Sequence, residues 1–261
     1  MSEPLVRLLA FGGVFLALAL WELAAPRRRP QASRRERWPA NLGILALDTL
    51  LLRLLFPLAA VGAALWAADR GWGLFNALSA PAWLAIPLSV LALDLIIYAQ
   101  HRAFHALPWL WRLHRVHHTD LDLDVSSAGR FHPLEMVVSM LVKIAAVVLL
   151  GAPALAVLVF EVLLNASAQF SHANIALPAW LDRPLRRLIV TPDMHRVHHS
   201  VHRDETDSNF AFLISAWDRM FGSYRDQPCE GHADMPLGLE DRRSREELGL
   251  VRLLTGPFRT P

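Results

Sequence analysis

The segment DLIIYAQHRAFH, at residues 94–105, joins an apolar stretch to two histidines spaced four residues apart. On a helix, residues four apart share one face, so His101 and His105 can reach the same metal ion. Asp94 and Tyr98 fall on the same stripe, within about 60° of the helical wheel. An acid within an apolar span is costly. We expect Asp94 to accept a hydrogen bond from a ligand imidazole and fix its tautomer; a simple hydrogen bond between helices is the alternative.

The composition of the 261-residue chain indicates a membrane protein. Apolar residues make up 54% and charged residues 19% of the sequence, whereas soluble domains average about 25% charged residues. The single cysteine, Cys229, excludes an internal disulfide and a paired-cysteine metal site. Lys143 is the only lysine, and no zinc-finger spacing occurs. We therefore expect no nucleic-acid partner.

Four apolar stretches predict the membrane topology. Residues 5–24, 43–68 and 82–100 are each long enough for one crossing, which needs about 20 apolar residues. Residues 134–170 are too long for one crossing, and the Gly-Ala-Pro sequence at 151–153 predicts a helical hairpin there. We expect an all-α integral membrane bundle of about three spans plus the hairpin, with a cytoplasmic, helical, histidine-rich cap.

The arginines orient the predicted bundle. Six of them lie in the loop 26–37, and the positive-inside rule places that loop in the cytoplasm. A cleaved signal peptide is the alternative for the first stretch, but its positive charges would precede the apolar run. The loop 69–81 then lies outside, and the hairpin leaves and returns to the inside. We therefore expect all the histidine clusters at the cytoplasmic surface of the membrane.

The pentapeptide HRVHH occurs twice, at 114–118 and at 195–199. The first histidine of each copy shares a helix face with the last two. Those two point about 100° apart and can serve two different metals. With His101 and His105, eight imidazoles indicate a two-metal site, and His172 is well placed as a ninth ligand after the hairpin. The predicted metal ligands are His101, His105, His114, His117, His118, His172, His195, His198 and His199.

Three other histidines lack such spacing. His132 precedes the hairpin, where Pro133 would begin the helix; it is a metal ligand, a substrate-side residue or a capping donor. We expect His202 and His232 at the surface. Imidazole binds iron, zinc, copper and nickel, so the ligand type does not name the metal. The Glu-x-x-His pattern of soluble di-iron bundles is absent from the sequence.

The three histidine boxes, in this order and between long apolar stretches, resemble those of the fatty acid hydroxylase/sterol desaturase superfamily of integral membrane oxygenases. The segments RFHPLE, SHANIALP, TDSNFAF and WDRMFGSY support the resemblance, which covers roughly residues 90–225. The boxes are more similar to those of bacterial members and of alkylglycerol monooxygenase than to those of the plant wax-synthesis branch. The chain has Asn209-Phe210-Ala211 where relatives often have Asn-Tyr-Gly, and Asn209 joins Asp94 and Tyr98 as a candidate supporting residue.

The resemblance implies a di-iron centre of two Fe ions, held by the predicted histidines, with O2 as co-substrate. It implies hydroxylation of a C–H bond of a sterol, fatty acyl or ether lipid taken from the bilayer. A desaturase with the same boxes and a non-enzymatic membrane protein that binds metal or haem are the alternatives.

The chain lacks a dinucleotide fingerprint, a haem-attachment motif and a cysteine set, so we expect an external electron donor: a reductase, a ferredoxin or a cytochrome. The arginine patches at 26–37 and 183–187 either attract an acidic carrier or serve topology and head-group binding. We divide the chain into N-terminal spans with the Arg-rich loop (1–89), a di-metal domain (90–225) and a cytoplasmic tail (226–261).

Overall fold

The computed structural model describes residues 2–259. Helices account for 69% of the chain, and within the described residues β-structure is limited to isolated bridges, such as that between Ile189 and Ile214. The predicted all-α class is confirmed.

Within residues 2–259, five helical segments are long and apolar enough to cross a membrane. This agrees with the prediction of three spans plus a hairpin and makes the chain an integral membrane protein. The segments are α1 (Glu3–Ala24), α2 (Arg34–Leu55) with its continuation α3 (Ala59–Asp69) and α4 (Leu74–Ala77), α5 (Ala82–Ala106), α7 (Pro133–Leu150) and α8 (Ala154–His172).

The predicted crossing at 43–68 lies within one candidate span, Arg34–Ala77, which is not a single helix. α2 ends at Leu55, and α3 begins only at Ala59. Pro57 lies between them, and a proline disfavours the helical conformation of the residue before it. Accordingly, Phe56 leaves the helical region, with φ −128° and ψ 68°.

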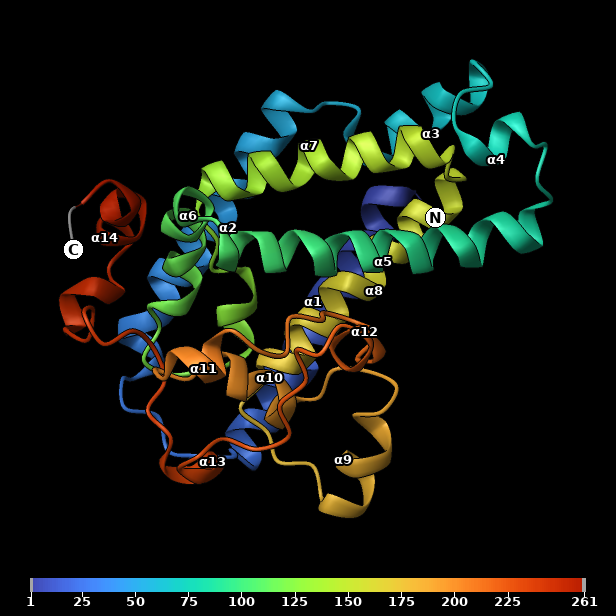
Figure 1. The fold of residues 1–261 in the computed structure, drawn as a ribbon. Helices are drawn as coiled ribbons and strands as arrows, with labels where there is room; N and C mark the ends of the chain where they lie inside the picture. The colour runs from blue at the N-terminus through green and yellow to red at the C-terminus, as the bar shows by residue number, and fades with distance from the viewer. Residues whose placement is uncertain (1, 260–261) are drawn as a thin grey trace.

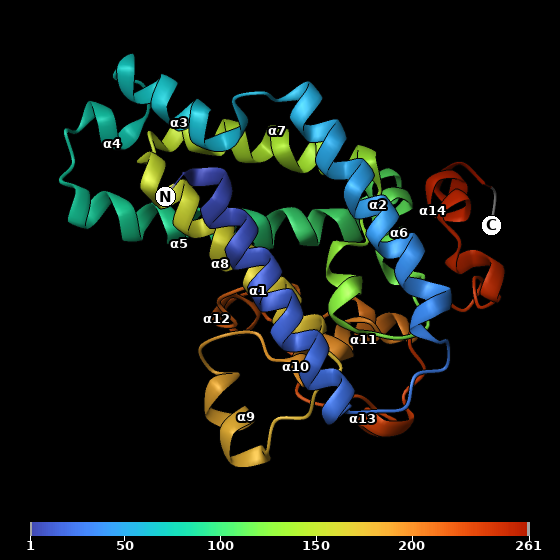
Figure 2. The same cartoon turned by 180° about the vertical axis from the view of Figure 1, so that it is seen from behind.

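The spans cross at an angle and meet the histidines at one end. α5 and α7 run across the molecule, while α1 and α8 pack together and cross them obliquely (Figures 1 and 2). α5 continues to Ala106, beyond the predicted end near residue 100, and so carries His101 and His105 on its last turns. It ends before Pro108, which begins α6 (Pro108–His118).

The remaining chain forms a cap at that end, which we define as residues 25–33, 107–132 and 173–259. It consists of α6 and short helices joined by loops (Figure 1). The short helices are η1 (Val125–Gly129), α9 (Ala179–Leu185), α10 (Pro192–His198), α11 (Arg203–Thr206), α12 (Ala216–Met220), α13 (Gly231–Asp234), η2 (Arg245–Leu248), α14 (Leu250–Thr255) and η3 (Gly256–Phe258).

A buried ion network fastens the spans to the cap. Arg37, at the start of α2, is fully buried; its Nε donates to Asp120 at 2.6 Å and its Nη1 to Asp124 at 2.6 Å. At the end of α1, the buried Glu22 accepts hydrogen bonds from the backbone N–H groups of Val125 and Asn174. Arg37 was expected in a polar cytoplasmic loop, and its position inside α2 corrects that part of the prediction.

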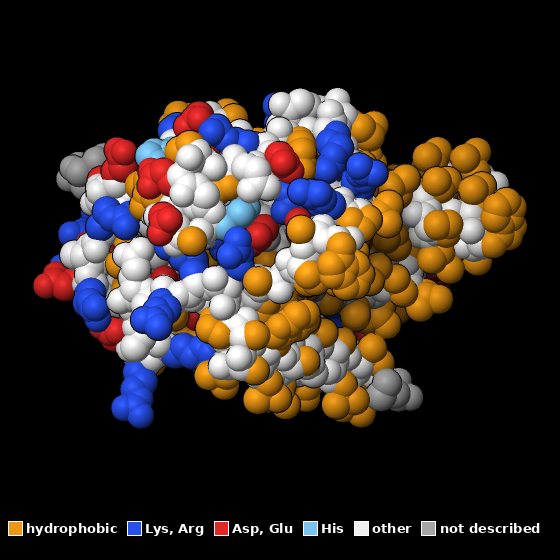
Figure 3. Space-filling model, turned by 90° about the horizontal axis from the view of Figure 1, so that it is seen from below, with side chains coloured by type: hydrophobic (Ala, Val, Ile, Leu, Met, Phe, Trp, Pro, Cys, Tyr) orange, Lys and Arg blue, Asp and Glu red, His pale blue; other side chains and the backbone are white. Residues whose placement is uncertain are grey.

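The surface divides into an apolar and a charged part (Figure 3). Leu78, Trp83, Leu149 and Leu155, all on the spans or their connections, are more than half exposed. Soluble proteins rarely expose apolar surface on this scale, and lipid tails would cover it in a bilayer.

Two glycines bring the connections at the far end of the spans into contact. Gly151 adopts φ +64° and ends α7, so the predicted hairpin turn is confirmed. Gly73, with φ +94°, lies against it: a Cβ at Gly73 would be 2.1 Å from the Gly151 nitrogen. Both a left-handed conformation and this close approach require glycine.

We predict that Gly73→Ala lowers the free energy of unfolding by at least about 1 kcal/mol, because the new Cβ strains the backbone and clashes with Gly151. Thermal unfolding in mild detergent measures the change. Gly12→Ala is the matched control: no atom lies within 4 Å of its added Cβ, so it should leave stability unchanged or raise it. Equal behaviour of the two variants would contradict the role of this contact.

Candidate metal centre

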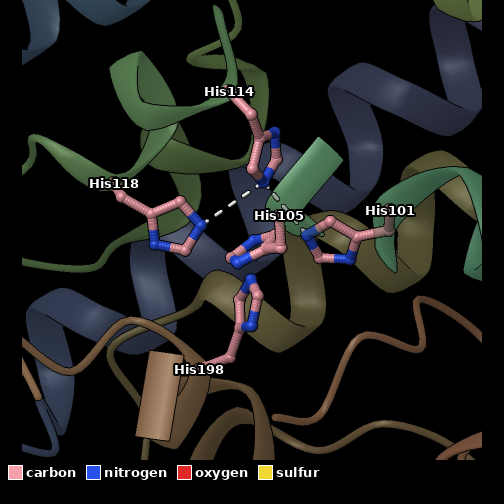
Figure 4. Close-up of side chains that lie close together, drawn as sticks. All are labelled: His101, His105, His114, His118 and His198. Atoms are coloured by element: carbon pink, nitrogen blue, oxygen red, sulfur yellow. Dashed lines mark hydrogen bonds between the residues drawn. The ribbon is translucent and has the colours of Figure 1, made fainter. Parts of the chain in front are cut away.

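All nine histidines predicted as ligands meet in two buried clusters. The five-histidine cluster comprises His101, His105, His114, His118 and His198 (Figure 4). The four-histidine cluster comprises His117, His172, His195 and His199. In each cluster, one ring nitrogen from every histidine lies within 4.8 Å of all the others.

Four helices supply the two clusters. The end of α5 contributes to the five-histidine cluster and the end of α8 to the four-histidine cluster, while α6 and α10 contribute to both. The adjacent histidines His117 and His118 divide between the clusters, because successive helical side chains point about 100° apart. His198 and His199 divide in the same way.

Most of the rings use Nδ1 for a hydrogen bond to the protein, which leaves Nε2 facing the cluster. His101 bonds to the Phe210 carbonyl at 2.7 Å, and His198 bonds to the Ser208 carbonyl at 2.8 Å. His172 bonds to the Ala168 carbonyl at 2.7 Å. Such second bonds fix the tautomer and orientation of metal-binding histidines.

The geometry of His117 and His172 fits a cation between their rings. Both Nδ1 atoms bond to backbone carbonyls, of Arg130 at 3.3 Å and of Ala168 at 2.7 Å, and must therefore donate. A neutral ring then has no proton on Nε2. The two Nε2 atoms nevertheless lie 3.0 Å apart. Their lone pairs repel at this distance, and a metal ion that both nitrogens bind removes the repulsion.

Burial keeps the cap histidines that belong to the two clusters in the neutral form that binds metal. It lowers the pKa of His114 to about 3. Burial also lowers, well below the ordinary range, the pKa values of His117, His118, His195, His198 and His199.

Two carboxylates support the five-histidine cluster, and the sequence did not predict this role for either of them. Glu135 Oε1 lies 2.6 Å from His114 Nδ1, and Asp207 Oδ1 lies 3.0 Å from His105 Nδ1. The signal for Glu135 was an acid in an apolar span, the same signal that singled out Asp94. Asp207 lies in a polar loop of the cap, where sequence spacing gave no signal.

The predicted role of Asp94 is wrong, because no ligand imidazole is among its hydrogen-bond partners. Its Oδ2 accepts hydrogen bonds from Trp217 Nε1 at 2.8 Å and from the Ile214 backbone at 3.1 Å. This matches the alternative of a hydrogen bond between packed elements. Asp94 thus holds residues 209–225 of the cap, here called the closing segment, against α5.

Tyr98 and Asn209 also act on the closing segment. The Tyr98 hydroxyl is 2.8 Å from Ser223 Oγ. Asn209, with φ +51°, donates from its side chain to the carbonyls of Met194 and Arg225. Asn209 thereby ties α10 to residues 209–225, and neither side chain is in a histidine cluster.

His132, His202 and His232, the three histidines without box spacing, lie outside both clusters. His132 caps α7: its Nδ1 accepts from the Leu134 backbone and its Nε2 donates to the Leu254 carbonyl. His202 is half-buried and contacts Glu230. The expectation of a surface position is wrong for His232, which is 7% exposed because the chain around α13 packs it against α10.

A membrane bundle that closes on a buried polyhistidine centre defines a class of membrane-embedded histidine-box proteins. The chain belongs to the fatty acid hydroxylase family: the model of that family matches residues 86–223, more than half of the sequence. This confirms the resemblance given by the three histidine boxes.

Named relatives are lipid hydroxylases and monooxygenases. The ornithine lipid hydroxylase OlsE of Rhizobium tropici is 26% identical over 178 residues, which are 68% of this chain and 51% of the relative. The alkylglycerol monooxygenase of Danio rerio is 32% identical over 54% of this chain and 30% of its own length. The cholesterol 25-hydroxylase of Rattus norvegicus is 28% identical over 54% of this chain and 47% of its own length.

The chain thus spans about half, or less, of the length of these relatives. No solved structure matches it. Hydroxylases and monooxygenases are oxidoreductases, and the prediction of an oxidoreductase family is confirmed.

We predict that Glu135→Ala weakens metal binding about 10- to 100-fold, because His114 loses the acceptor that orients its ring. Metal retention against a chelator measures the loss, and circular dichroism checks the helices. Glu135→Gln is the control, since its side-chain oxygen still accepts from His114. Wild-type retention by the alanine variant would show that Glu135 does not support a ligand.

Proposed function

We propose that this protein is a membrane-bound, non-haem di-iron oxygenase that hydroxylates a C–H bond of a lipid. The observation that carries the proposal is the pair of buried clusters, in which nine neutral imidazoles face one another. Two clusters with five and four histidines fit two metal ions, which His117 and His118 would hold from adjacent positions of α6. Family membership favours iron over the other metals that bind imidazole.

Bound iron supplies the activation of O2, which amino-acid side chains do not provide. In the overall reaction, one oxygen atom of O2 is inserted into the C–H bond. Two electrons from the external donor and two protons reduce the other oxygen atom to water. The protein holds the ligands neutral, fixes their tautomers through Nδ1 and excludes water from the rings.

The Phe212 side chain links the apolar core of the spans to both histidine clusters. Its ring lies 5.0 Å from that of His101 and 6.5 Å from that of His195, between the centroids, so that it contacts both clusters. Phe212 also packs on the apolar core of the spans, which includes Ile97 and Phe160. Each relative named above is named for an amphiphilic lipid, which favours a substrate of that kind here.

We place the external electron donor on the cap. Arg27 and Arg183, one from each predicted arginine patch, line the same cavity of about 490 Å³. Asp193, which also lines it, is two residues before His195 in α10. Three arginines and three aspartates line this cavity, so a redox protein that presents both acidic and basic groups would dock here, close to the four-histidine cluster.

The decisive test is the metal content of protein purified in mild detergent from cells grown with 57Fe. We expect about two irons per chain, spin-coupled in Mössbauer spectra of the oxidised state. Haem iron, or no metal after reconstitution with iron, would overturn the proposal. A product with a new double bond in place of a hydroxyl group would assign the same centre to a desaturase.

We predict that His117→Ala and His198→Ala each reduce bound iron by half or more, because each removes a ligand from one cluster. Iron per chain is measured by mass spectrometry, and helix content by circular dichroism. His132→Ala should retain full iron, since His132 is a capping residue outside both clusters. Full iron in either cluster variant would contradict the ligand assignment.

We also propose that the cap faces the cytoplasm, and Cys229 reports on this because it is the only cysteine and is exposed. A membrane-impermeant maleimide should label it in permeabilised cells and not in intact ones. In a Cys229→Ser background, Asp69→Cys, at the far end of α3, should be labelled in intact cells. The opposite pattern would invert the orientation.

A further inference from the structure

Gln169 on α8 carries a buried side-chain amide. It is 1% exposed, and among residues 2–259 neither its Oε1 nor its Nε2 has a hydrogen-bond partner. Gln100 on α5 differs in one bond: its Nε2 donates to Ser139 Oγ at 2.8 Å, while its Oε1 also has no partner among the described residues. A buried polar group without a partner destabilises the folded state. Gln169 therefore costs stability unless something other than the protein binds its amide.

Gln169 lies between the apolar core of the spans and the metal centre. Leu164, five residues earlier on α8, packs against the apolar core that also contacts Phe212. His172, three residues later, belongs to the four-histidine cluster. Helical residues three apart have Cβ atoms about 5–6 Å apart. An apolar chain that follows α8 toward the metals would thus meet this amide one turn before a metal ligand.

We propose that the Gln169 amide binds the polar group of the lipid substrate. A neutral amide offers two N–H donors and one carbonyl acceptor. It suits an uncharged hydroxyl, ether or amide group, because a charged group would lose its hydration here without a counter-charge on Gln169. The inference rests on the proposed lipid oxygenase and adds how the substrate is held.

This position also restricts which carbon is oxidised. The polar group is bound within about one helical turn of His172, so the carbon that reaches the metals lies close to that group along the chain. The terminal carbons of a long acyl tail would instead extend back along α8 toward the membrane core. The enzyme would therefore oxidise its lipid near the polar end.

The first experiment measures the melting temperature, and this measurement requires no substrate. Gln169→Met keeps the shape of the side chain and removes the orphan amide, so the melting temperature of the full-length protein in detergent should stay equal or rise. Gln100→Met is the matched control and should lower it, because the bond to Ser139 is lost. A fall for Gln169→Met as large as that for Gln100→Met would overturn the proposal, since it would reveal a structural partner for the amide.

The second experiment compares hexadecan-1-ol with hexadecane as ligands of the same proteins. The alcohol should raise the melting temperature of the wild type and of Gln100→Met more than the alkane does, and Gln169→Met should lose this difference. Equal responses of the wild type to both ligands, or a difference retained in Gln169→Met, would contradict the proposal.

Iron measured on the same samples separates this inference from the proposed function. Two irons per chain without a Gln169-dependent response to the alcohol would overturn the role of Gln169 alone. A Gln169-dependent response in a protein that holds no iron after reconstitution would keep the polar-group site and overturn the di-iron oxygenase.

Discussion

Repulsion between the lone pairs of buried, uncharged imidazoles is the constraint on which the rest of the structure depends. Six of the nine rings are held through Nδ1, two of them by Glu135 on α7 and Ala168 on α8 and four by atoms outside the spans. The carbonyls of Phe210, Ser208 and Arg130 and the carboxylate of Asp207 all belong to the cap. The cap is therefore the outer half of the candidate metal centre, and the spans supply the inner half through α5, α7 and α8.

Ion pairs with very low exposure keep these two halves in register. Arg37 on α2 joins Asp120 and Asp124 in the loop that leads to Arg130, whose carbonyl in turn orients His117. Removing one partner of such a pair costs about 3–5 kcal/mol, because it leaves an uncompensated buried charge. Arg37 was expected in a loop that sets the membrane topology. It instead helps to position His117.

The histidine positions could be predicted because their spacing is local. The i+3 and i+4 offsets at 101–105, 114–118 and 195–199 follow from helix geometry alone, and an even number of crossings between the boxes brings them to one end. The partners of Asp94 could not be predicted, because Trp217 is more than 120 residues away in sequence. The same holds for Asp207 and for the burial of His232, which depend on how irregular cap loops fold over α10. The helix break at Pro57 could have been predicted from the proline itself, but the expectation for residues 43–68 rested on their apolar pattern alone.

The origin of the ligands has a consequence for how the protein is made. Both clusters include residues of α10, which follows α8, the last of the membrane-spanning segments. During synthesis, every span can enter the bilayer before either cluster has its full set of ligands. For the proposed metal centre, metal capture would then be the final step of assembly, and its binding energy would act as folding energy for the cap. A cell short of metal would accumulate inserted but unfinished chains, with a loose cap open to proteases.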